Sequence, residues 1–459
     1  CRGGSLLIIT SAEGSTALSE ENRRLKKRLY FVAAGYFRFF ANFAFKRWKP
    51  RVIAITGSVG KTTMLHMVEF ELGDQAHYSH DANSAFGIAF DLVGLRGITG
   101  SKLRWIYLIF AVPFRSLYYR HRERYYIVEI DGERPHETEF LASWLKPEVT
   151  LWISLGRSHA VQFENQVKEG MFENLDKAIT HEFAMLPEYT QKIIMIDGDV
   201  PLMVKATNKI REKGKTAAEV RACSKKDLQG YVVQPDSTDF TIGGKQTTNF
   251  HFASPQPRDL AIQLVMLREL IDYLKHPLKT DFAKMPLPPG RSSYFEGKNG
   301  LKLIDSSYNA HLISVASILD LASSLKVRPK WLVIGDIVDQ GSIEGEEHTK
   351  LADLIAKTKP DRVILVGRRT RAYTLPRLKT LGYVVRPDGN LPVVRSYDDV
   401  KQALADIEQN ATGAETIIFK GSQYLEWMIE KLLQNPEDAK KLPRREAAAI
   451  KRREKRGLN

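Results

Sequence analysis

Residues 51–63 read RVIAITGSVGKTT, a short β-branched strand that runs directly into a glycine-rich turn and then a helix. In such an arrangement the backbone N–H groups of the turn and of the helix N-terminus point at bound phosphates, where the helix dipole favours negative charge. Lys61 is then placed to reach the β- and γ-phosphates of a nucleotide, and the Thr62 hydroxyl to ligate Mg²⁺. The stretch therefore predicts a site for a nucleoside triphosphate.

The spacing of this loop is G-x-x-G-K-T, shorter than the common G-x-x-x-x-G-K-[ST] pattern, and alone it also fits an ordinary strand–turn–helix. The apolar strand RVIAI before the loop and the helical sequence MLHMVEFEL after it supply the context that phosphate binding requires. The predicted nucleotide-binding residues of the loop are Gly57, Ser58, Val59, Gly60, Lys61, Thr62 and Thr63.

The composition is that of a globular protein, with 43% apolar and 27% charged residues in 459. A chain of this length can hold two or three domains with separate cores. Its two cysteines, Cys1 and Cys223, provide neither a disulfide framework nor a metal-ligand spacing, which suits a reducing cytosol. We therefore expect a cytoplasmic protein.

The net charge of +14 is concentrated at the C-terminal end. Residues 440–459 contain nine Lys or Arg against two Glu, a contribution of +7. Nucleic acid and anionic lipid are both possible partners of such a tail. Plain solvation of a frayed helix or disordered arm is the favoured interpretation, and nucleic-acid binding is not expected.

Two aromatic segments come near to a membrane signal, although no stretch of 18 or more uncharged apolar residues exists. Residues 29–48 carry nine aromatic residues with basic residues around them, and residues 105–114 read WIYLIFAVPF. Either segment could lie in a membrane interface, at the inner face, where aromatic and cationic side chains are favoured. Each could equally pack on the protein's own surface or on a partner subunit.

Strands and helices alternate along most of the chain, which predicts an α/β protein with parallel sheets. A P-loop parallel-sheet ATPase domain is expected at 50–286, with short polar strands over 213–252 forming an antiparallel appendage. The proline-rich sequence KMPLPPG at 284–290 is the expected linker. A smaller doubly wound domain should follow at 287–435, between an N-terminal helical segment (1–49) and the basic tail (436–459).

Seven segments, in the same order along the chain, resemble motifs of the Mur ligase family. They are ITGSVGKTT (55–63), DANSAFGIAFDL (81–92), VEIDGERPHE (128–137), LGRSHAVQF (155–163), LIDSSYNAHLIS (303–314), IGDIVDQGS (334–342) and FKGS (419–422). The resemblance covers about residues 50 to 433 and is greatest to the branch that adds D-alanyl-D-alanine to a UDP-muramoyl tripeptide. A ligase of peptidoglycan precursor synthesis is the function that it implies.

The resemblance also implies the roles of individual residues. Glu129 and His159 would bind Mg²⁺ together with Thr62, and Arg291 would contact the phosphates of ATP. Asn83, Asp305 and Asn309 match nucleotide-site positions, whereas Lys420 and Ser422 would hold the incoming substrate or the transition state. The expected catalytic residues are Lys61, Glu129, His159 and Lys420.

The chemistry that this family performs is coherent with these residues. A carboxylate is a poor acyl donor, so ATP first phosphorylates it to an acyl phosphate, and an amine then displaces phosphate to form an amide. The task of the protein is mainly electrostatic, because charge on the transferred phosphoryl group must be neutralised. ATP and Mg²⁺ are the expected cofactors, and a monomer is expected.

Three features depart from the family pattern. Thr180 stands where the family has a carbamylated lysine, with Lys177 nearly one helical turn earlier as a possible substitute. Ser306 and His311 replace an aspartate and an asparagine. Only 50 residues precede the ATP loop, so the UDP-binding domain of the family is expected to be missing, and a lipid-linked carrier could take the place of UDP.

Two other functions remain open. The first is a different amide ligase on the same fold, such as one that extends folate with glutamate or polymerises amino acids. The second is a degenerate homologue that binds ATP and acts as a scaffold for wall enzymes. The YNAH sequence at 308–311 favours the wall branch, the missing lysine favours the scaffold, and the intact Lys61, Thr62 and Glu129 oppose the scaffold.

Overall fold

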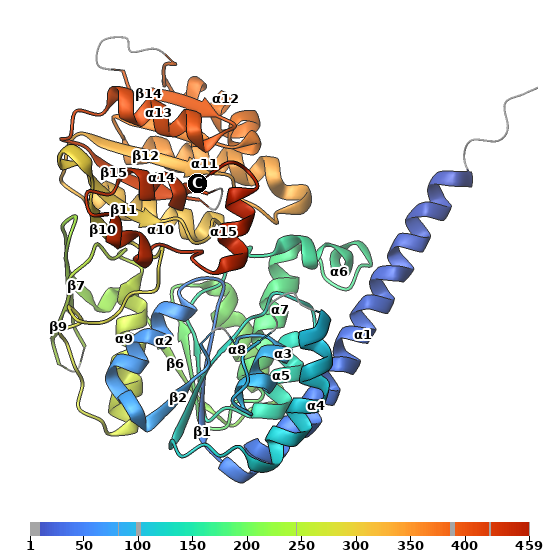
Figure 1. Cartoon of the computed structure of the whole chain (residues 1–459). Coiled ribbons are helices and arrows are strands. Elements are labelled where there is room, and N and C mark those ends of the chain that lie inside the picture. Colours follow the sequence, from blue (N-terminus) through green and yellow to red (C-terminus); the bar gives the residue numbers. More distant parts are fainter. Residues whose placement is uncertain are drawn as a thin grey trace, which may run out of the picture. The chain divides into compact units, whose positions relative to one another are not determined.

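The structure is a computed structural model that describes residues 10–80, 82–97, 102–244, 246–385, 391–421 and 424–458. Side chains are described from Leu29 onward, with the exception of Lys102. Its helices and strands are labelled in Figure 1. The chain divides into two compact units. Unit 1 comprises residues 1–51 and 75–128, and unit 2 comprises residues 52–74 and 129–459. Among the helices in these described ranges, none is long and apolar enough to cross a membrane.

Unit 1 is built from helices around a small parallel strand pair. The strand β2 (Ala76–Tyr78) pairs in parallel with β3 (Tyr125–Ile130), whose last two residues belong to unit 2. The helices are α1 (Thr10–Trp48), α3 (Ala85–Asp91) and α4 (Lys102–Tyr118). Phe37 on α1 is 2% exposed and packs edge-on against Phe90 of α3, which joins the predicted N-terminal helical segment to the core of the unit.

Part of the region predicted as the ATPase domain (50–286) forms the first half of unit 2, and the strands there are parallel. Residues 75–128 of that region belong to unit 1 instead. The neighbours, in order, are β1 (Arg51–Thr56), β4 (Val149–Trp152), β5 (Ile193–Asp197) and β6 (Glu219–Cys223). Each residue of β4 and β5 is buried, as expected for strands covered on both faces. The surrounding helices are α2 (Lys61–Leu72), α5 (Glu137–Leu145), α6 (Glu164–Lys168), α7 (Leu175–Glu188), α8 (Pro201–Glu212) and α9 (Leu260–Leu274).

The predicted antiparallel appendage is present as a separate three-stranded sheet. It contains β7 (Leu228–Val233), β8 (Thr238–Ile242) and β9 (Thr248–Phe252), in this order and antiparallel. Phe240, Phe250 and Phe252 are each at most 1% exposed on its inner face. Its alternation of buried and exposed residues is typical of a sheet with one solvated face.

The second half of unit 2 is the predicted doubly wound domain. Its sheet has the order β10-β11-β15-β12-β13-β14, in which only β10 is antiparallel. The strands are β10 (Ser293–Glu296), β11 (Lys302–Ser306), β12 (Lys330–Gly335), β13 (Arg362–Val366), β14 (Val393–Tyr397) and β15 (Thr416–Lys420). The predicted linker 284–290 contains no helix or strand.

Alternate residues of this sheet face two different layers of helices. One apolar core joins Leu332 and Ile418 to helices α10 (Leu312–Ser324), α11 (Glu344–Thr358) and α12 (Leu375–Thr380). The other joins Val333 and Phe419 to α13 (Val400–Asn410) and α14 (Leu425–Leu432). The expectation of a doubly wound domain is therefore confirmed.

The basic tail differs from the solvated arm that we expected. A 3-10 turn, η7 (Pro436–Lys441), and a helix, α15 (Ala447–Glu454), follow α14, and Leu442 and Leu458 are buried in the same core as α14. Arg445 and Arg453 both donate to Glu430, at 2.8 and 2.6 Å. The prediction of a solvated arm was wrong because burial of these two leucines and ion pairing of the two arginines hold the tail in place.

Candidate active site

The loop after β1 has the backbone shape that its glycines predict. Gly57 and Gly60 have φ values of 144° and 86°, which favour glycine. A Cβ atom on Gly60 would lie 2.4 Å from the Nε2 of Gln263, and one on Gly57 would lie 2.8 Å from the Oγ of Ser154. Larger residues would therefore be both strained and crowded at these two positions.

The two residues between these glycines fasten the loop to the segment after β4. The Ser58 hydroxyl donates to the carbonyl of Gly156 (2.9 Å) and accepts from the N–H of the same residue (2.8 Å). The N–H of Val59 donates to the hydroxyl of Ser154, which itself donates to the carbonyl of Val59. The loop is thus held rigidly before any ligand binds.

Lys61, the first residue of α2, points back over the loop. Its ammonium donates to the carbonyl of Gly57 (2.6 Å) and forms an ion pair with Asp131 (2.7 Å). Burial acts to lower the pKa of Lys61, but the carboxylates of Asp131 and Glu129 outweigh burial and raise it. The lysine is therefore cationic at neutral pH, as a phosphate ligand must be.

Thr62 and Glu129 come together as the sequence predicts. The Thr62 hydroxyl donates to Oε2 of Glu129 at 3.0 Å, and Glu129 is only 8% exposed. Burial raises the pKa of Glu129, and the nearby Lys61 opposes part of that rise. A hydroxyl beside a buried carboxylate is a set of hard oxygen donors that fits Mg²⁺. Thr63 follows in the first turn of α2.

Arg291 brings the C-terminal half of unit 2 to the same place. Its Nη2 donates to the Thr62 hydroxyl at 3.1 Å, and its guanidinium lies 4.9 Å from the centre of the Tyr308 ring. Burial lowers the pKa of Arg291, and the negative charge of Glu129 opposes that effect. The charges of two cationic side chains, Lys61 and Arg291, thus act on Glu129, the carboxylate that the Thr62 hydroxyl contacts.

His159 was predicted to bind Mg²⁺ together with Glu129, but the carboxylate that it contacts most closely is that of Glu133. Its Nε2 is 2.9 Å from Glu133 and its Nδ1 is 3.8 Å from Asp339. Burial acts to lower the pKa of His159, but the hydrogen bond to Glu133 and the charge of that carboxylate raise it. Its ring centre is 5.2 Å from that of His311, whose pKa burial and the charge of His159 lower to about 3.

Asp305 and Lys420 lie on adjacent strands at the carboxyl end of the C-terminal sheet. β11 and β15 pair so that Asp305 is opposite Phe419. One oxygen of Asp305 accepts from the N–H of Ser307 (2.9 Å), whereas the buried Oδ2 has no hydrogen-bond partner among the described residues. Burial and the charge of Arg291 lower the pKa of Lys420 to about 7.

The remaining predicted residues are Asn309, Asn83 and Ser422. Asn309 is exposed between β11 and α10. Asn83 belongs to unit 1, one residue before Ser84, whose hydroxyl accepts from the N–H of Gly87 at the start of α3. Ser422 lies outside the described residues.

Sequence reasoning missed Asp131 and Glu133, which contact two of the predicted catalytic residues. The sequence offered a signal, because Glu129, Asp131 and Glu133 alternate at and beyond the carboxyl end of β3. Polar residues at that end of a parallel strand are placed where ligands bind.

Where the resemblance implies a carbamylated lysine, this chain has Thr180, whose hydroxyl has a structural role. Thr180 is buried in α7 and donates to the carbonyl of Asp176. Lys177 is half exposed and forms an ion pair with Glu173. Arg157 makes a bidentate contact with Asp176, at 2.7 and 2.9 Å. An arginine from the loop after β4 and the Thr180 hydroxyl therefore both contact Asp176.

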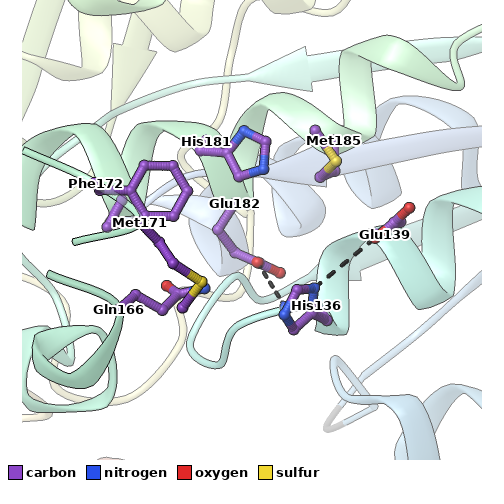
Figure 2. Close-up of a pocket in the computed structure, with 9 residues that line it drawn as sticks. His136, Glu139, Gln166, Met171, Phe172, His181, Glu182 and Met185 are labelled. Carbon is purple, nitrogen blue, oxygen red and sulfur yellow. Dashed lines mark hydrogen bonds and ion pairs between the residues drawn. The ribbon is translucent and has the colours of Figure 1, made fainter. Parts of the chain in front are cut away.

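Glu182, two residues further along α7, lines a pocket of about 160 Å³ (Figure 2). It accepts from the N–H groups of His136 (2.7 Å) and Thr138 (2.8 Å), at the start of α5. Burial raises the pKa of Glu182 to about 7. The glutamate therefore stabilises a helix N-terminus, where negative charge is favoured.

Comparison with known proteins places these residues in context. Residues 290–423, which include Arg291 and Lys420, match the family model described as Mur ligase, glutamate ligase domain. Over 390 residues the chain is 23% identical to the UDP-N-acetylmuramoyl-tripeptide–D-alanyl-D-alanine ligase of Bacillus subtilis (strain 168), which covers 84% of this chain and 76% of that relative.

Two solved structures are similar in fold. The MurF ligase of Thermotoga maritima in complex with ADP has a TM-score of 0.67 at 16% identity, over 88% of this chain and 84% of that one. The UDP-N-acetylmuramate-alanine ligase MurC of Thermotoga maritima has a TM-score of 0.53 at 15% identity, over 86% and 77%. The predicted α/β fold class, with a parallel-sheet domain and a C-terminal α/β domain, is confirmed.

Proposed function

Because the chain is a member of the Mur ligase family, whose members are ATP-dependent amide ligases, we propose that it joins D-alanyl-D-alanine to the peptide stem of a muramoyl-peptide. The observation that carries the proposal is the meeting of Lys61, Thr62, Glu129 and Arg291 in one site. The name of the Bacillus relative supports the choice of dipeptide and of UDP-linked acceptor.

Each half of unit 2 contributes cationic groups to this site. Lys61 and Arg291 would neutralise the transferred phosphoryl group, whose negative charge spreads over its outer oxygens in the transition state. The Lys61 ammonium is paired with Asp131 at 2.7 Å, so a bound phosphate would have to compete for that ammonium. The ion pair with Asp131 thereby keeps the Lys61 ammonium charged and aligned over the loop before ATP binds.

A divalent cation fits the Thr62–Glu129 pair. Glu129 would hold Mg²⁺ with the Thr62 hydroxyl, and the buried position of the carboxylate makes a cationic partner favourable. Mg²⁺ would supply charge neutralisation to the phosphates when bound. We include His159 and Glu133 as a second set of candidate metal ligands, since their nitrogen and oxygen lie 2.9 Å apart.

The C-terminal half would hold the reacting groups in line. Asp305 has a buried oxygen without a hydrogen-bond partner in the described part of the chain, and such an atom is poised to accept from a nucleotide or an amine. Asn309 would contact the nucleotide beside it. Lys420, with its pKa lowered to about 7, would regain its full charge beside an anionic acyl phosphate.

In the proposed reaction the stem carboxylate attacks the γ-phosphorus of ATP and releases ADP. The amine of D-alanyl-D-alanine then attacks the acyl carbon, and inorganic phosphate leaves as the amide forms. One phosphate is therefore released for each dipeptide joined. The proton lost by the amine must pass to a base or to solvent.

Thr180 supports a second candidate, a homologue that binds ATP without turning it over. The hydroxyl of Thr180 cannot be carbamylated, and Lys177 is paired with Glu173 at the surface. A ligase that lacks the modified lysine would need another cation, and Arg157 is the group that contacts the same turn of α7.

The deciding experiment measures phosphate release by the protein with Mg-ATP, UDP-N-acetylmuramoyl-tripeptide and D-alanyl-D-alanine, together with the mass of the product. Release that needs both substrates, with a product heavier by one dipeptide, supports the proposal. Binding of ATP without turnover in this or any related donor–acceptor pair overturns it in favour of the scaffold.

A further inference from the structure

The outer faces of α1 and α4 carry an unusual number of exposed apolar side chains. On α1 they recur at intervals of three and four residues, so they lie along one side of the helix. They are Leu29, Val32, Tyr36, Phe39 and Phe43 on α1, with Leu103, Ile106, Tyr107, Ile109, Phe110, Phe114, Leu117 and Tyr118 on α4. These thirteen compare with eight on all other described residues, which marks the face as an interaction surface.

The two helices form a single surface, here called the α1–α4 face. The Tyr36 hydroxyl donates to the carbonyl of Ile109 (2.8 Å), and Arg47 donates to the carbonyls of Ser116 (2.9 Å) and Tyr119 (2.7 Å). α1 and α4 run side by side at the end of α1 nearest to β1 in the sequence (Figure 1). The exposed side chains are therefore displayed together by a fixed pair of helices.

The core of unit 1 does not need these side chains. Another side of α1 supplies Ala34, Phe37 and Ala41 to the interior, and α4 supplies Leu108 and Val112, all at most 2% exposed. In contrast, Val32 is 70% exposed and Phe110 is 73% exposed. Internal packing consequently explains one side of each helix and does not account for the exposed apolar side chains of the α1–α4 face.

The charge around this face identifies the kind of partner. Residues 29–48 and 102–124 contain nine Lys or Arg and one acidic residue, Glu123. Two copies of the chain would bring equal positive charges together, which is unfavourable. Anionic lipid is complementary to the charge, and phenylalanine and tyrosine side chains among basic residues match the chemistry of a membrane interface.

We propose that the α1–α4 face binds the interface of an anionic lipid bilayer, with both helices lying in the plane of the membrane. The exposed aromatic and aliphatic side chains enter the headgroup–acyl boundary, and the arginines remain among the phosphates. The contact proposed is with the membrane interface alone. It does not depend on the proposed ligase reaction, but it would bring that reaction to precursors carried by lipid.

The test is flotation of the full chain with vesicles of phosphatidylcholine containing about 30% phosphatidylglycerol, against vesicles of phosphatidylcholine alone. The chain should float with the anionic vesicles, and the double variant Phe110→Ser/Phe114→Ser should lower its partition coefficient at least tenfold, roughly the loss of two inserted rings. Val232→Ser is the matched control, because Val232 is 57% exposed on β7 of the other unit.

A second pair of variants examines the charge. Arg120 and Arg122 are exposed beyond the end of α4, and replacing both by serine should weaken binding to anionic vesicles by about fivefold for each charge. Binding to phosphatidylcholine alone should not change. Added salt should imitate these variants, because screening weakens exposed charge interactions.

A tryptophan reporter gives a direct measure of insertion. In Phe110→Trp, brominated acyl chains should quench fluorescence beyond the level of the six native tryptophans. Absence of vesicle binding and quenching would overturn the proposal. If light scattering then showed a dimer that Phe110→Ser/Phe114→Ser dissociates, the occupant of the face would be a second copy.

Discussion

Arg291 donates a hydrogen bond of 3.1 Å from its Nη2 to the Thr62 hydroxyl, although the two residues are 229 positions apart. The same hydroxyl donates to Glu129 at 3.0 Å. One side chain in the first turn of α2 therefore contacts both a carboxylate of β3 and the first arginine after the linker. Nucleotide bound at the loop would contact both halves of unit 2, so a closure of these halves would assemble the site.

Arg291→Ala should raise the KM for ATP at least about tenfold, because a buried guanidinium makes charge-assisted bonds to phosphate. Arg291→Lys should recover only part of this loss, since lysine lacks the planar fork and the stacking on Tyr308. Steady-state kinetics with varied ATP provides the measurement. Arg328→Ala, at an exposed arginine paired with Asp361, is the control and should leave KM unchanged.

Lys61→Ala should lower the rate of phosphate release by roughly 10²–10³, as loss of a preorganised cation at the transferred group does. Asp131 would also lose its partner, so the melting temperature should be recorded to exclude unfolding. Lys213→Ala, at an exposed lysine after α8, is the control. Unchanged release by Lys61→Ala would contradict the assignment of the loop as the catalytic phosphate site.

Glu129→Gln should raise the Mg²⁺ concentration needed for half-maximal activity, because an amide replaces the anionic ligand of the Thr62–Glu129 pair. A readout independent of turnover is the thermal stabilisation by ADP, which should lose its dependence on Mg²⁺. Glu212→Gln, at an exposed glutamate of α8, should behave as the wild type. If Glu129→Gln and Glu212→Gln had the same Mg²⁺ dependence, Glu129 would not be a ligand of the metal.

The free energy of unfolding should fall as the pH rises from about 4.5 to about 7. Burial raises the pKa of Glu182 to about 7 in the folded state, so the folded protein binds more protons than the unfolded chain over that window. The resulting loss in the free energy of unfolding approaches about 3 kcal/mol above pH 7. Glu71, with its pKa also raised to about 7, should add to the same trend.

Glu182→Gln separates this contribution in urea unfolding at pH 5 and pH 8. The amide group of glutamine cannot accept from both N–H groups of α5, so the variant should be less stable than the wild type at pH 5. The difference in stability between the two pH values should nevertheless become smaller. An equal or larger pH dependence in the variant would show that other groups carry the titration.

Leu442→Ala should destabilise the C-terminal half by about 2–5 kcal/mol, the usual loss for a truncated core leucine. Leu442 is 1% exposed in the core beside α14, and Arg444 two residues later donates to the carbonyls of Ser307 and Tyr308. Differential scanning calorimetry measures the change. Leu391→Ala, at a leucine that is 48% exposed, is the control, and equal effects would mean that the tail does not support the domain.

The ATP loop and its strand were predictable because their geometry is local. A β-branched strand, two glycines and a helix start place Lys61 and Thr62 through backbone conformation alone. The strand YYIVEI was likewise identifiable from its apolar run and is β3. The helical turn expected between Lys177 and Thr180 lies in α7. Helix α8 was not predicted, because polar residues interrupt its apolar face.

Several contacts between distant segments were not predictable. The pairing of Lys61 with Asp131, the clash that Gln263 imposes on any larger residue at Gly60, and the approach of Glu133 to His159 each join segments that no local pattern connects. The tail shows the same limit, since its nine basic residues predicted solvation until burial of Leu442 and Leu458 opposed it.

By itself, the sequence determined the order of strands and helices, the phosphate-binding loop, the resemblance to the Mur ligases and the basic, aromatic character of residues 29–48. These follow from hydrophobic period, turn chemistry and spacing, which act over a few residues. Only the tertiary structure decided which carboxylate pairs with which cation, which aromatic rings are buried and which remain exposed. Those outcomes depend on free energies of burial and ion pairing between residues brought together from across the chain.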